Sequence, residues 1–224
     1  MTASQLILLM IPAAYLLGSV PFGLLVGWTR GIDVRKAGSG NIGATNVGRL
    51  LGKKFFFVVF FLDMLKSLVP MLVAGHFAHR SSVITPTLYF EWLLVGFAAM
   101  FGHMFSVFLK FTGGKGVATS AGIILGLWPF YTQPAFITLT IFVVVLYTTR
   151  YMSIASISAA ISFPVCYLTM ATLRQWDPFG HQWPLTLFSL LLATLVVYKH
   201  RTNIQRLRAG TENRLGAKKV EPGV

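Results

Sequence analysis

The chain is poor in acidic residues, in cysteine and in charged residues of either sign. Of its 224 residues, 6 are Asp or Glu and 11% are charged, whereas 55% are hydrophobic. Soluble domains carry about 25% charged residues. This composition cannot cover a water-facing surface, so the bilayer must solvate most of the chain. The single Cys166 excludes an intrachain disulfide and is interpreted as a small buried hydrophobe.

The excess of basic residues has a different meaning here than in a soluble protein. The net charge is +13, and nucleic-acid binding would require a basic face on a folded soluble module. The basic residues instead stand between apolar runs, so we interpret them as topology and anion-binding signals and expect no nucleic-acid partner. The first apolar run, residues 6–28, has no Lys or Arg before it and is too long for a cleavable signal, which predicts a retained span.

Several apolar runs are long enough to cross the hydrocarbon core, which takes about 20 helical residues. The clear candidates are residues 4–28, 55–78, 88–109, 152–173 and 183–199. Pro129 and Pro134 interrupt the stretch 116–150, which predicts two short helices, 116–131 and 134–150, joined by a tight turn. We therefore predict an all-α protein with seven transmembrane helices, forming one domain of residues 1–216 followed by a flexible C-terminal tail, residues 217–224.

The distribution of Lys and Arg predicts the orientation, because these residues are enriched in cytoplasmic loops. With seven spans and the N-terminus outside, all of the 19 Lys and Arg residues lie in inside segments except Arg80, Arg174 and the intramembrane Lys66. Six spans would place the first loop and the C-terminal tail, the two most basic segments, on opposite sides. The expected topology has the N-terminus outside and the C-terminus inside.

The first of three polar segments, residues 38–49, reads GSGNIGATNVGR. Its glycines let backbone N–H groups converge on an oxyanion, and a helix that begins there adds its positive end. Ser39 and Thr45 offer hydroxyl groups, and Arg49 shares a helix face with Thr45. A dinucleotide site is rejected, since no strand precedes the G-x-G-x-x-G pattern. The alternative is a glycine turn with Arg49 snorkelling to the interface.

The second polar segment, residues 102–119, reads GHMFSVFLKFTGGKGVAT. Gly113, Gly114 and Lys115 resemble a phosphate loop, but Gly116 stands where a Walker A motif has the Ser or Thr that holds magnesium. The segment therefore indicates oxyanion binding without a metal. The alternative is a glycine-rich turn with a topogenic lysine. His103 is interpreted as a structural histidine rather than a catalytic base.

The third polar segment, residues 199–212, reads KHRTNIQRLRAGTE. If the last span continues as a helix, His200 and Asn203 share a face. A basic amphipathic tail lying on anionic lipid would explain the arginines but not these two residues. Within the second span, Asp63 and Lys66 form a pair that can neutralise itself and lock the helix.

Together the three segments resemble the bacterial acyl-phosphate:glycerol-3-phosphate acyltransferases, the PlsY family. The second is similar to the family motif GHxFPxFLxFxGGKGVAT and the third to HRxNIxRLxxGxE, while RYMS at residues 150–153 is also similar. The resemblance runs from about Tyr15 to Gly216. Ser106 replaces the usual proline, and Ser67 replaces a common glycine, which is expected to loosen packing there.

The resemblance implies transfer of a fatty acyl group from acyl phosphate to the 1-hydroxyl of glycerol 3-phosphate, which gives lysophosphatidic acid, the first step of phospholipid synthesis. It implies a bacterial inner-membrane protein with a cytoplasmic active site, no cofactor and no metal, and a functional link to the enzyme that makes acyl phosphate. It assigns the donor phosphate to Ser39, Thr45, Gly113 and Gly114. It assigns glycerol 3-phosphate to Arg49, Lys115, His200 and Asn203, with Ser153 nearby.

The residue chemistry agrees with that implication. Two anionic substrates need cations and N–H donors, and an acyl phosphate already has a good leaving group, so positioning can carry the catalysis. No Ser-His-Asp arrangement is evident, and none of the five histidines begins an H-x-x-x-x-D motif. The catalytic candidates are Ser39, Lys115 and His200, and the general base is either His200 or the donor phosphate. The alternative function is transport of a phosphorylated solute, which predicts mid-membrane polar groups and repeated halves.

Overall fold

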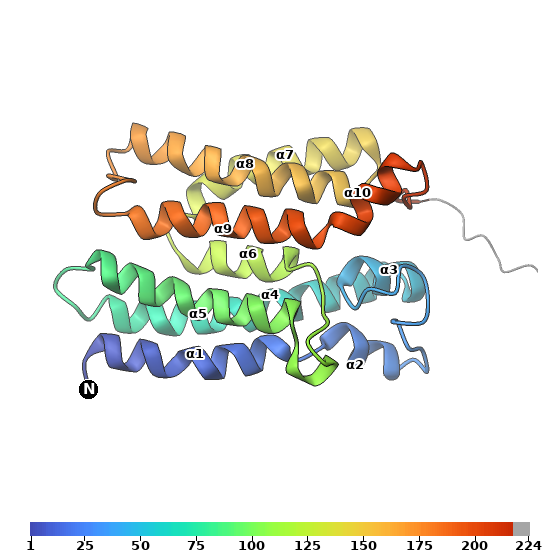
Figure 1. Ribbon diagram of the computed structural model, residues 1–224, viewed down its shortest axis with the longest axis horizontal. Helices are drawn as coiled ribbons and strands as arrows, with labels where there is room; N and C mark the ends of the chain where they lie inside the picture. Colours follow the sequence, from blue (N-terminus) through green and yellow to red (C-terminus); the bar gives the residue numbers. More distant parts are fainter. Residues whose placement is uncertain (217–224) are drawn as a thin grey trace, which may run out of the picture.

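The computed structural model describes residues 1–216, and that part of the chain is helical without any β-strand (Figure 1). The predicted tail, residues 217–224, lies outside the described residues. The elements are α1 (Ala3–Ser19), α2 (Phe22–Trp28), α3 (Ala44–Leu51), α4 (Lys53–Ala78), α5 (Pro86–Met104), a 3₁₀ turn (Val107–Leu109), α6 (Val117–Gly126), α7 (Thr132–Thr149), α8 (Met152–Leu173), α9 (Trp183–Lys199) and α10 (Arg201–Arg208). The predicted all-α class is confirmed.

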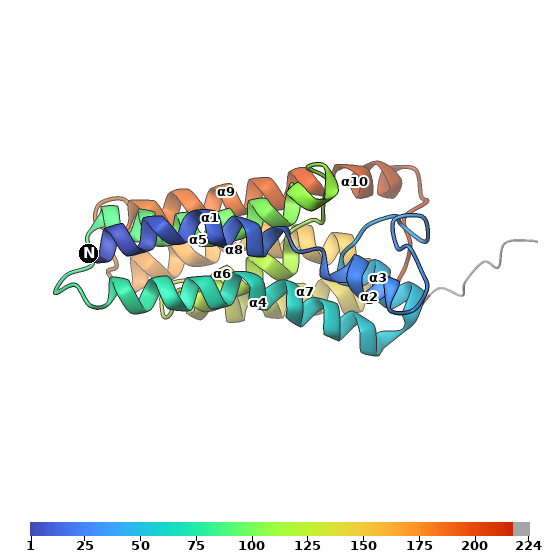
Figure 2. The same ribbon diagram turned by 90° about the horizontal axis from the view of Figure 1, so that it is seen from below.

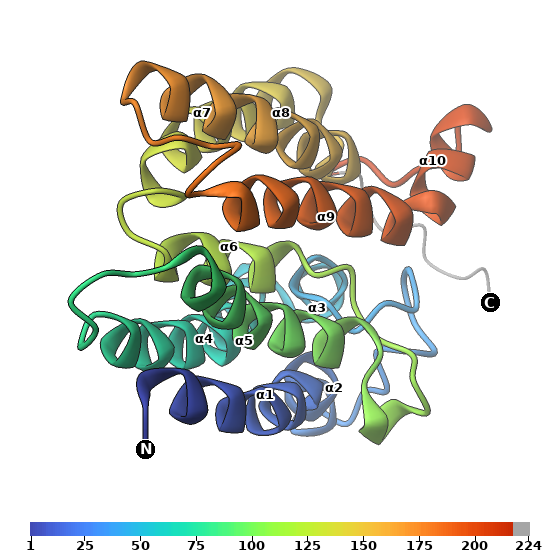
Figure 3. The same cartoon turned by 60° about the vertical axis from the view of Figure 1, so that its left-hand side comes forward.

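The long helices lie side by side in two groups (Figures 1 and 3). Helices α1, α4, α5 and α6 form one group, and α7, α8 and α9 form the other. Contacts of α5 with α9 and of α6 with α7 join the groups. The short helices α2, α3 and α10, together with the loop between α2 and α3, gather at the end of the bundle away from the N-terminus (Figure 2).

Four helical segments are long and apolar enough to cross a membrane, and the bent pair α9–α10 makes a fifth if it counts as one span. The four are Ala3–Trp28, Lys53–Ala78, Thr132–Thr149 and Met152–Leu173. The other predicted spans coincide with α5 and with the shorter apolar helix α6. Each predicted span thus has a helical counterpart, while the number of membrane crossings stays a prediction.

The helix boundaries differ from the predicted ones where local chemistry interrupts the helix. The first span breaks at Val20, because Pro21 restricts the residue before it and has no N–H to donate. Helix α5 ends at Met104, before the predicted residue 109, and its chain turns back through Ser106 and Thr112. Helix α6 ends at Gly126, before the predicted residue 131, so Pro129 lies in the connection to α7 and not within a helix.

Small residues allow the helices that carry the site to approach closely. A Cβ on Gly18 of α1 would lie 2.1 Å from the Ala99 carbonyl oxygen, and a Cβ on Gly102 of α5 would lie 2.2 Å from the Tyr15 carbonyl oxygen. Close backbone contact is the usual way in which membrane helices pack, because lipid gives no hydrophobic drive to pair them. The α1–α5 pair therefore forms a rigid support for the loop that follows α5.

The two family departures have specific contacts. The Ser106 hydroxyl donates to the Ser19 carbonyl at 2.6 Å, and its N–H, which a proline would lack, donates to the Thr112 carbonyl at 3.2 Å. The Ser67 hydroxyl donates to the Thr119 carbonyl at 2.7 Å and joins α4 to α6. Ser67 is fully buried, so the expected loosening of the packing is wrong.

Candidate active site

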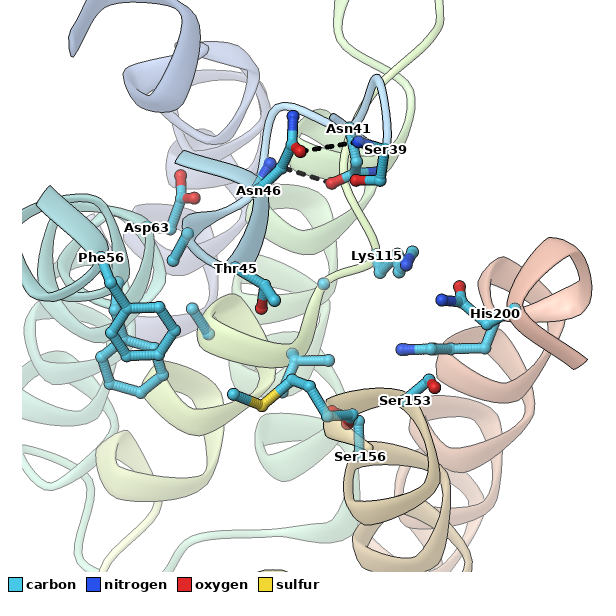
Figure 4. A pocket seen from close by; sticks show the side chains of 18 of the residues that line it. Ser39, Asn41, Thr45, Asn46, Phe56, Asp63, Lys115, Ser153, Ser156 and His200 are labelled. Atoms are coloured by element: carbon cyan, nitrogen blue, oxygen red, sulfur yellow. Dashed lines mark hydrogen bonds between the residues drawn. The ribbon is translucent and has the colours of Figure 1, made fainter. Parts of the chain in front are cut away.

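The three polar segments meet around one cavity of about 110 Å³ at the end of the bundle that holds α3 and α10 (Figure 4). Of the predicted site residues, seven line it: Ser39, Thr45, Arg49, Lys115, Ser153, His200 and Asn203. Gly113 and Gly114 lie beside the cavity, against His103, and are not part of its wall. Segments separated by more than a hundred residues are thus brought together as predicted.

The first segment is held in shape by Asn46, a residue to which the sequence assigned no role. Its buried side chain donates to the carbonyls of Val34 at 2.9 Å and Ala37 at 3.1 Å, and accepts from the Ser39 N–H at 2.8 Å. Gly38 has φ +61°, and a Cβ there would lie 2.4 Å from Asn46 Oδ1. The only signal in the sequence was its place within the motif. Asn46 anchors the loop to α3 and so presents Ser39 to the cavity.

The second segment presents Lys115 and the start of α6. The Gly114 N–H donates to the His103 carbonyl at 3.0 Å, so this group is not free for a phosphate. Gly116, Val117 and Ala118 line the cavity instead, and they belong to the first turn of α6 or its cap. Helix starts carry N–H groups without intrahelical partners and favour anions. The N–H groups that face the cavity therefore lie slightly further along the chain than Gly113 and Gly114, where the sequence placed them.

The Lys115 ammonium points into the cavity (Figure 4). Burial lowers the pKa of Lys115 to about 8; Glu212 opposes the shift, and Arg206 and Arg49 add to it. A bound anion would strongly stabilise the charged form of this partly desolvated ammonium, which lies near two guanidinium groups. This environment is the expected one for a phosphate site that is filled only when substrate binds.

The third segment bends, so the continued helix on which His200 and Asn203 would share a face does not form. Helices α9 and α10 meet at an angle of 52°, with His200 between them. His200 Nδ1 lies 2.7 Å from the Val196 carbonyl. A carbonyl can only accept, so Nδ1 carries the proton and Nε2 has a free lone pair. Burial lowers the pKa of His200 to about 4, so the ring is neutral at physiological pH. Both His200 and Asn203 still line the cavity.

Glu212 is a cavity residue that the sequence reasoning missed, although it ends the third motif. It is 8% exposed, and its carboxylate accepts from Ser153 Oγ at 2.9 Å, Asn203 Nδ2 at 2.6 Å and Arg206 Nε at 2.8 Å. Burial acts to raise the pKa of Glu212, but these hydrogen bonds hold it below the usual value. The Asn203 amide oxygen is buried without a partner among the described residues, which leaves it available to a substrate hydroxyl.

The chain after α10 contacts both α3 and the turn between α7 and α8. Arg49 Nη2 of α3 donates to the Asn213 carbonyl at 3.4 Å, and the Leu215 N–H donates to the Arg150 carbonyl at 2.7 Å. Arg214 Nε donates to the Tyr151 hydroxyl at 2.9 Å. The same segment therefore fixes Arg49 and brings Glu212 into the site.

Apolar residues form the other wall of the cavity. Phe56 and Phe60 come from α4 and stack at 6.0 Å, Phe142 comes from α7, and Met152 begins α8. Their neighbours Phe57 and Phe61 on α4 are about half exposed. One cavity therefore combines cations with an apolar wall, a combination that suits an amphipathic anionic substrate.

Known proteins with the same combination of segments identify the family. A family model described as glycerol-3-phosphate acyltransferase matches residues 8–210. The chain belongs to the glycerol-3-phosphate acyltransferase family. It is 43% identical to the glycerol-3-phosphate acyltransferase of Geotalea daltonii over 206 residues, 92% of this chain and 96% of the relative. It is 42% identical to that of Geobacter sulfurreducens over 210 residues, 94% and 98% of the two chains.

Solved structures of the family agree. The chain is similar to PlsY, an integral membrane glycerol 3-phosphate acyltransferase, in its glycerol 3-phosphate form, with a TM-score of 0.80 and 38% identity over 94% of this chain and 96% of that one. The lysophosphatidic acid form of PlsY matches with a TM-score of 0.77. The predicted PlsY resemblance and the predicted enzyme class, an acyltransferase, are confirmed. With its apolar helices, the chain is a multi-pass membrane protein.

Proposed function

We propose that this chain transfers a fatty acyl group from acyl phosphate to the 1-hydroxyl of glycerol 3-phosphate. The acceptor oxygen forms a new bond to the acyl carbon, the bond from that carbon to the phosphate oxygen breaks, and lysophosphatidic acid and inorganic phosphate result. The observation that carries the proposal is one cavity in which Arg49 and Lys115 lie with the neutral His200 beside an apolar wall. Relatives crystallised in glycerol 3-phosphate and lysophosphatidic acid forms support it.

The cations of the cavity suit the phosphate of the acceptor. Arg49 offers a planar fork of donors, and Lys115 a compact charge. Glu212 holds Asn203 and Arg206 in place by hydrogen bonds. Because Glu212 binds the amide nitrogen of Asn203, the amide oxygen can accept a hydrogen bond from a glycerol hydroxyl. The acceptor is then held at both ends, which is the arrangement that orientation-based catalysis requires.

The donor fits between the first segment and the start of α6. The Ser39 and Thr45 hydroxyls and the α6 start can donate to its phosphate oxygens, which gain charge as the acyl–phosphate bond breaks. The acyl chain follows the apolar wall of Phe56, Phe60 and Phe142 toward the lipid. This placement brings the acyl carbon to the border between the polar and the apolar halves of the cavity.

The transferred proton goes to the donor phosphate. A pKa of about 4 makes His200 a weak base, whereas the phosphate oxygens gain negative charge, and with it basicity, as the acyl–phosphate bond breaks. The proton that leaves the acceptor hydroxyl is therefore taken by a phosphate oxygen and departs with the product phosphate. His200 instead helps to hold the glycerol moiety through Nε2, and the attacking hydroxyl keeps its proton directed at the phosphate.

We further propose the seven-span topology with the N-terminus outside, a location in the bacterial inner membrane, and a cavity that opens to the cytoplasm. The excess of Lys and Arg in the predicted inside segments supports this orientation. A cytoplasmic opening also suits the two soluble-phase partners, glycerol 3-phosphate and the enzyme that makes acyl phosphate.

The test is turnover by the purified protein with acyl phosphate and glycerol 3-phosphate, in the presence of EDTA, with acyl-CoA and acyl carrier protein thioesters as alternative donors. Turnover is expected with acyl phosphate alone and without metal, because Gly116 replaces the magnesium-binding hydroxyl of a Walker A loop. Lys115→Met should abolish most turnover, whereas Lys53→Met, at an exposed position of α4, should not. Turnover that needs magnesium, or that occurs only with a thioester donor, contradicts the proposal.

A further inference from the structure

A buried polar network to which the proposed reaction assigns no role reaches the cavity wall through Asp63 and His103. Asp63 and Lys66 of α4 are 3% and 2% exposed, and His103 of α5 is 4% exposed. Lys66 Nζ lies 2.8 Å from Asp63 Oδ1 and donates to the Val20 carbonyl at 3.1 Å, at the break between α1 and α2. Asp63 and Lys66 thus satisfy each other, and the helix lock predicted from the sequence does not need the histidine.

His103 has a separate structural relationship with the phosphate-binding loop. Its carbonyl accepts from the Gly114 N–H at 3.0 Å, and a Cβ on Gly114 would lie 2.1 Å from His103 Nε2. A Cβ on Gly113 would lie 2.2 Å from the same carbonyl oxygen. The imidazole and the carbonyl of one residue therefore hold the two glycines, and Lys115 follows directly after them.

The orientation of the ring depends on Asp63. His103 Nδ1 lies 3.5 Å from Asp63 Oδ1, beyond hydrogen-bond length, and has no other partner among the described residues. A buried N–H without a partner is costly, and a carboxylate oxygen lies in the right place to accept it. A shift of roughly 0.3–0.5 Å would bring the pair to the usual N–H···O distance. Asp63 and His103 both line the cavity, so a ligand there bears directly on this pair.

We propose that His103, oriented by Asp63, is a positioning residue that holds the loop of Gly113, Gly114 and Lys115 in its phosphate-binding form. The ring supports Gly114 from behind, and the Nδ1–H bond to Asp63 closes when a phosphate dianion loads Lys115 and the start of α6. The inference rests on the proposed function, because it assumes that the anion is the phosphate of a substrate.

The decisive comparison uses the two amides that imitate different ring nitrogens. Asparagine at position 103 can place its N–H near Nδ1, within reach of Asp63, whereas glutamine reaches the Nε2 position. His103→Asn should therefore retain a larger kcat/KM for acyl phosphate and glycerol 3-phosphate than His103→Gln, by roughly 10-fold, with the loss appearing mainly in KM. Thermal unfolding of both variants shows whether they fold alike. Equal losses, or the reverse order, would overturn the proposal.

A double variant with a smaller residue at position 103 and a larger one at position 114 provides a second test. His103→Ala opens the space that the methyl group of Gly114→Ala needs, so the double variant removes the steric clash. If the ring only fills space, the double variant regains wild-type kinetics; the proposal predicts that it stays roughly 10- to 100-fold below wild type in kcat/KM. His76→Phe, at an exposed histidine of the same helix as Asp63, is the control and should be unchanged.

The two levels of failure can be told apart. If the wild-type protein turns over acyl phosphate while both tests fail, only the role of His103 is wrong. If the wild-type protein has no turnover with acyl phosphate, the proposed function is wrong, and the role of His103 then depends on inorganic phosphate binding, measured by calorimetry for wild type and for His103→Gln. Equal phosphate affinity of the two would reject the positioning role as well.

Discussion

Asn203 of α10 donates to Glu212 at 2.6 Å, and this hydrogen bond holds the segment after α10 against the wall of the cavity. Glu212 also accepts hydrogen bonds from Ser153 of α8 and from Arg206 of α10. One carboxylate therefore joins α8 and α10 at the cavity.

Replacing this carboxylate should weaken both stability and catalysis. Glu212→Gln loses charge-assisted hydrogen bonds, each of which contributes about 1.5–3 kcal/mol when charged groups take part, so the thermal unfolding midpoint in detergent should fall and kcat/KM for glycerol 3-phosphate should drop. Asn213→Ala is the matched control, because only the backbone carbonyl of Asn213 contacts Arg49. An unchanged midpoint in Glu212→Gln would show that the segment is not held by this carboxylate.

The rate should depend on the charge of Lys115. Burial lowers the pKa of Lys115 to about 8 in the free site, so its ammonium is present below that pH and is lost as the pH rises through it. Since kcat/KM reports groups of the free enzyme, kcat/KM for glycerol 3-phosphate should fall above about pH 8, while kcat, measured with the phosphate bound, should fall at higher pH.

Lys115→Arg is the control for this pH dependence, because a guanidinium keeps its charge in the alkaline range. Its kcat/KM should be lower at neutral pH but should show no step near pH 8. A step that persists unchanged in Lys115→Arg would assign the titration to another group.

His200→Gln separates binding from proton transfer. Glutamine can present an oxygen near the position of Nε2, so the variant should keep appreciable kcat at saturating glycerol 3-phosphate and lose mainly in the acceptor KM. A general base would instead cost about 10²- to 10⁴-fold in kcat even at saturation. A collapse of kcat with unchanged KM would establish His200 as the base and contradict the low pKa assigned to it.

Cysteine labelling checks the orientation. In a Cys166→Ala background, single cysteines at the exposed positions Thr112 and Thr211 should be protected from an impermeant thiol reagent in sealed cells, whereas a cysteine at Ser82, in the loop between α4 and α5, should react. The expectation follows from the distribution of Lys and Arg among the loops. Reaction at Thr112 or Thr211 from outside would reverse the proposed topology.

The sequence by itself determined the all-α class, the apolar character of the long helices, and most of the residues that line the cavity. Apolar length and proline act locally, so the helices around Pro129 and Pro134 could be predicted without knowledge of the fold. Motif identity placed Ser39, Lys115 and His200 in the site for a similar reason, since glycine, hydroxyl and cationic residues at these spacings have few other uses in a membrane protein.

Tertiary structure alone decided which groups are free to act. The Gly114 N–H donates to the carbonyl of His103, and the Asn46 side chain accepts from the Ser39 N–H in the first loop. Glu212 accepts the hydrogen bonds of Ser153 and Asn203. Ser153 and Glu212 are 59 residues apart along the chain, and the other three contacts each cross a loop that leads into or out of a helix. No local pattern encodes such contacts, because they depend on how the helix groups pack and on the burial that this packing imposes on Lys115 and His200.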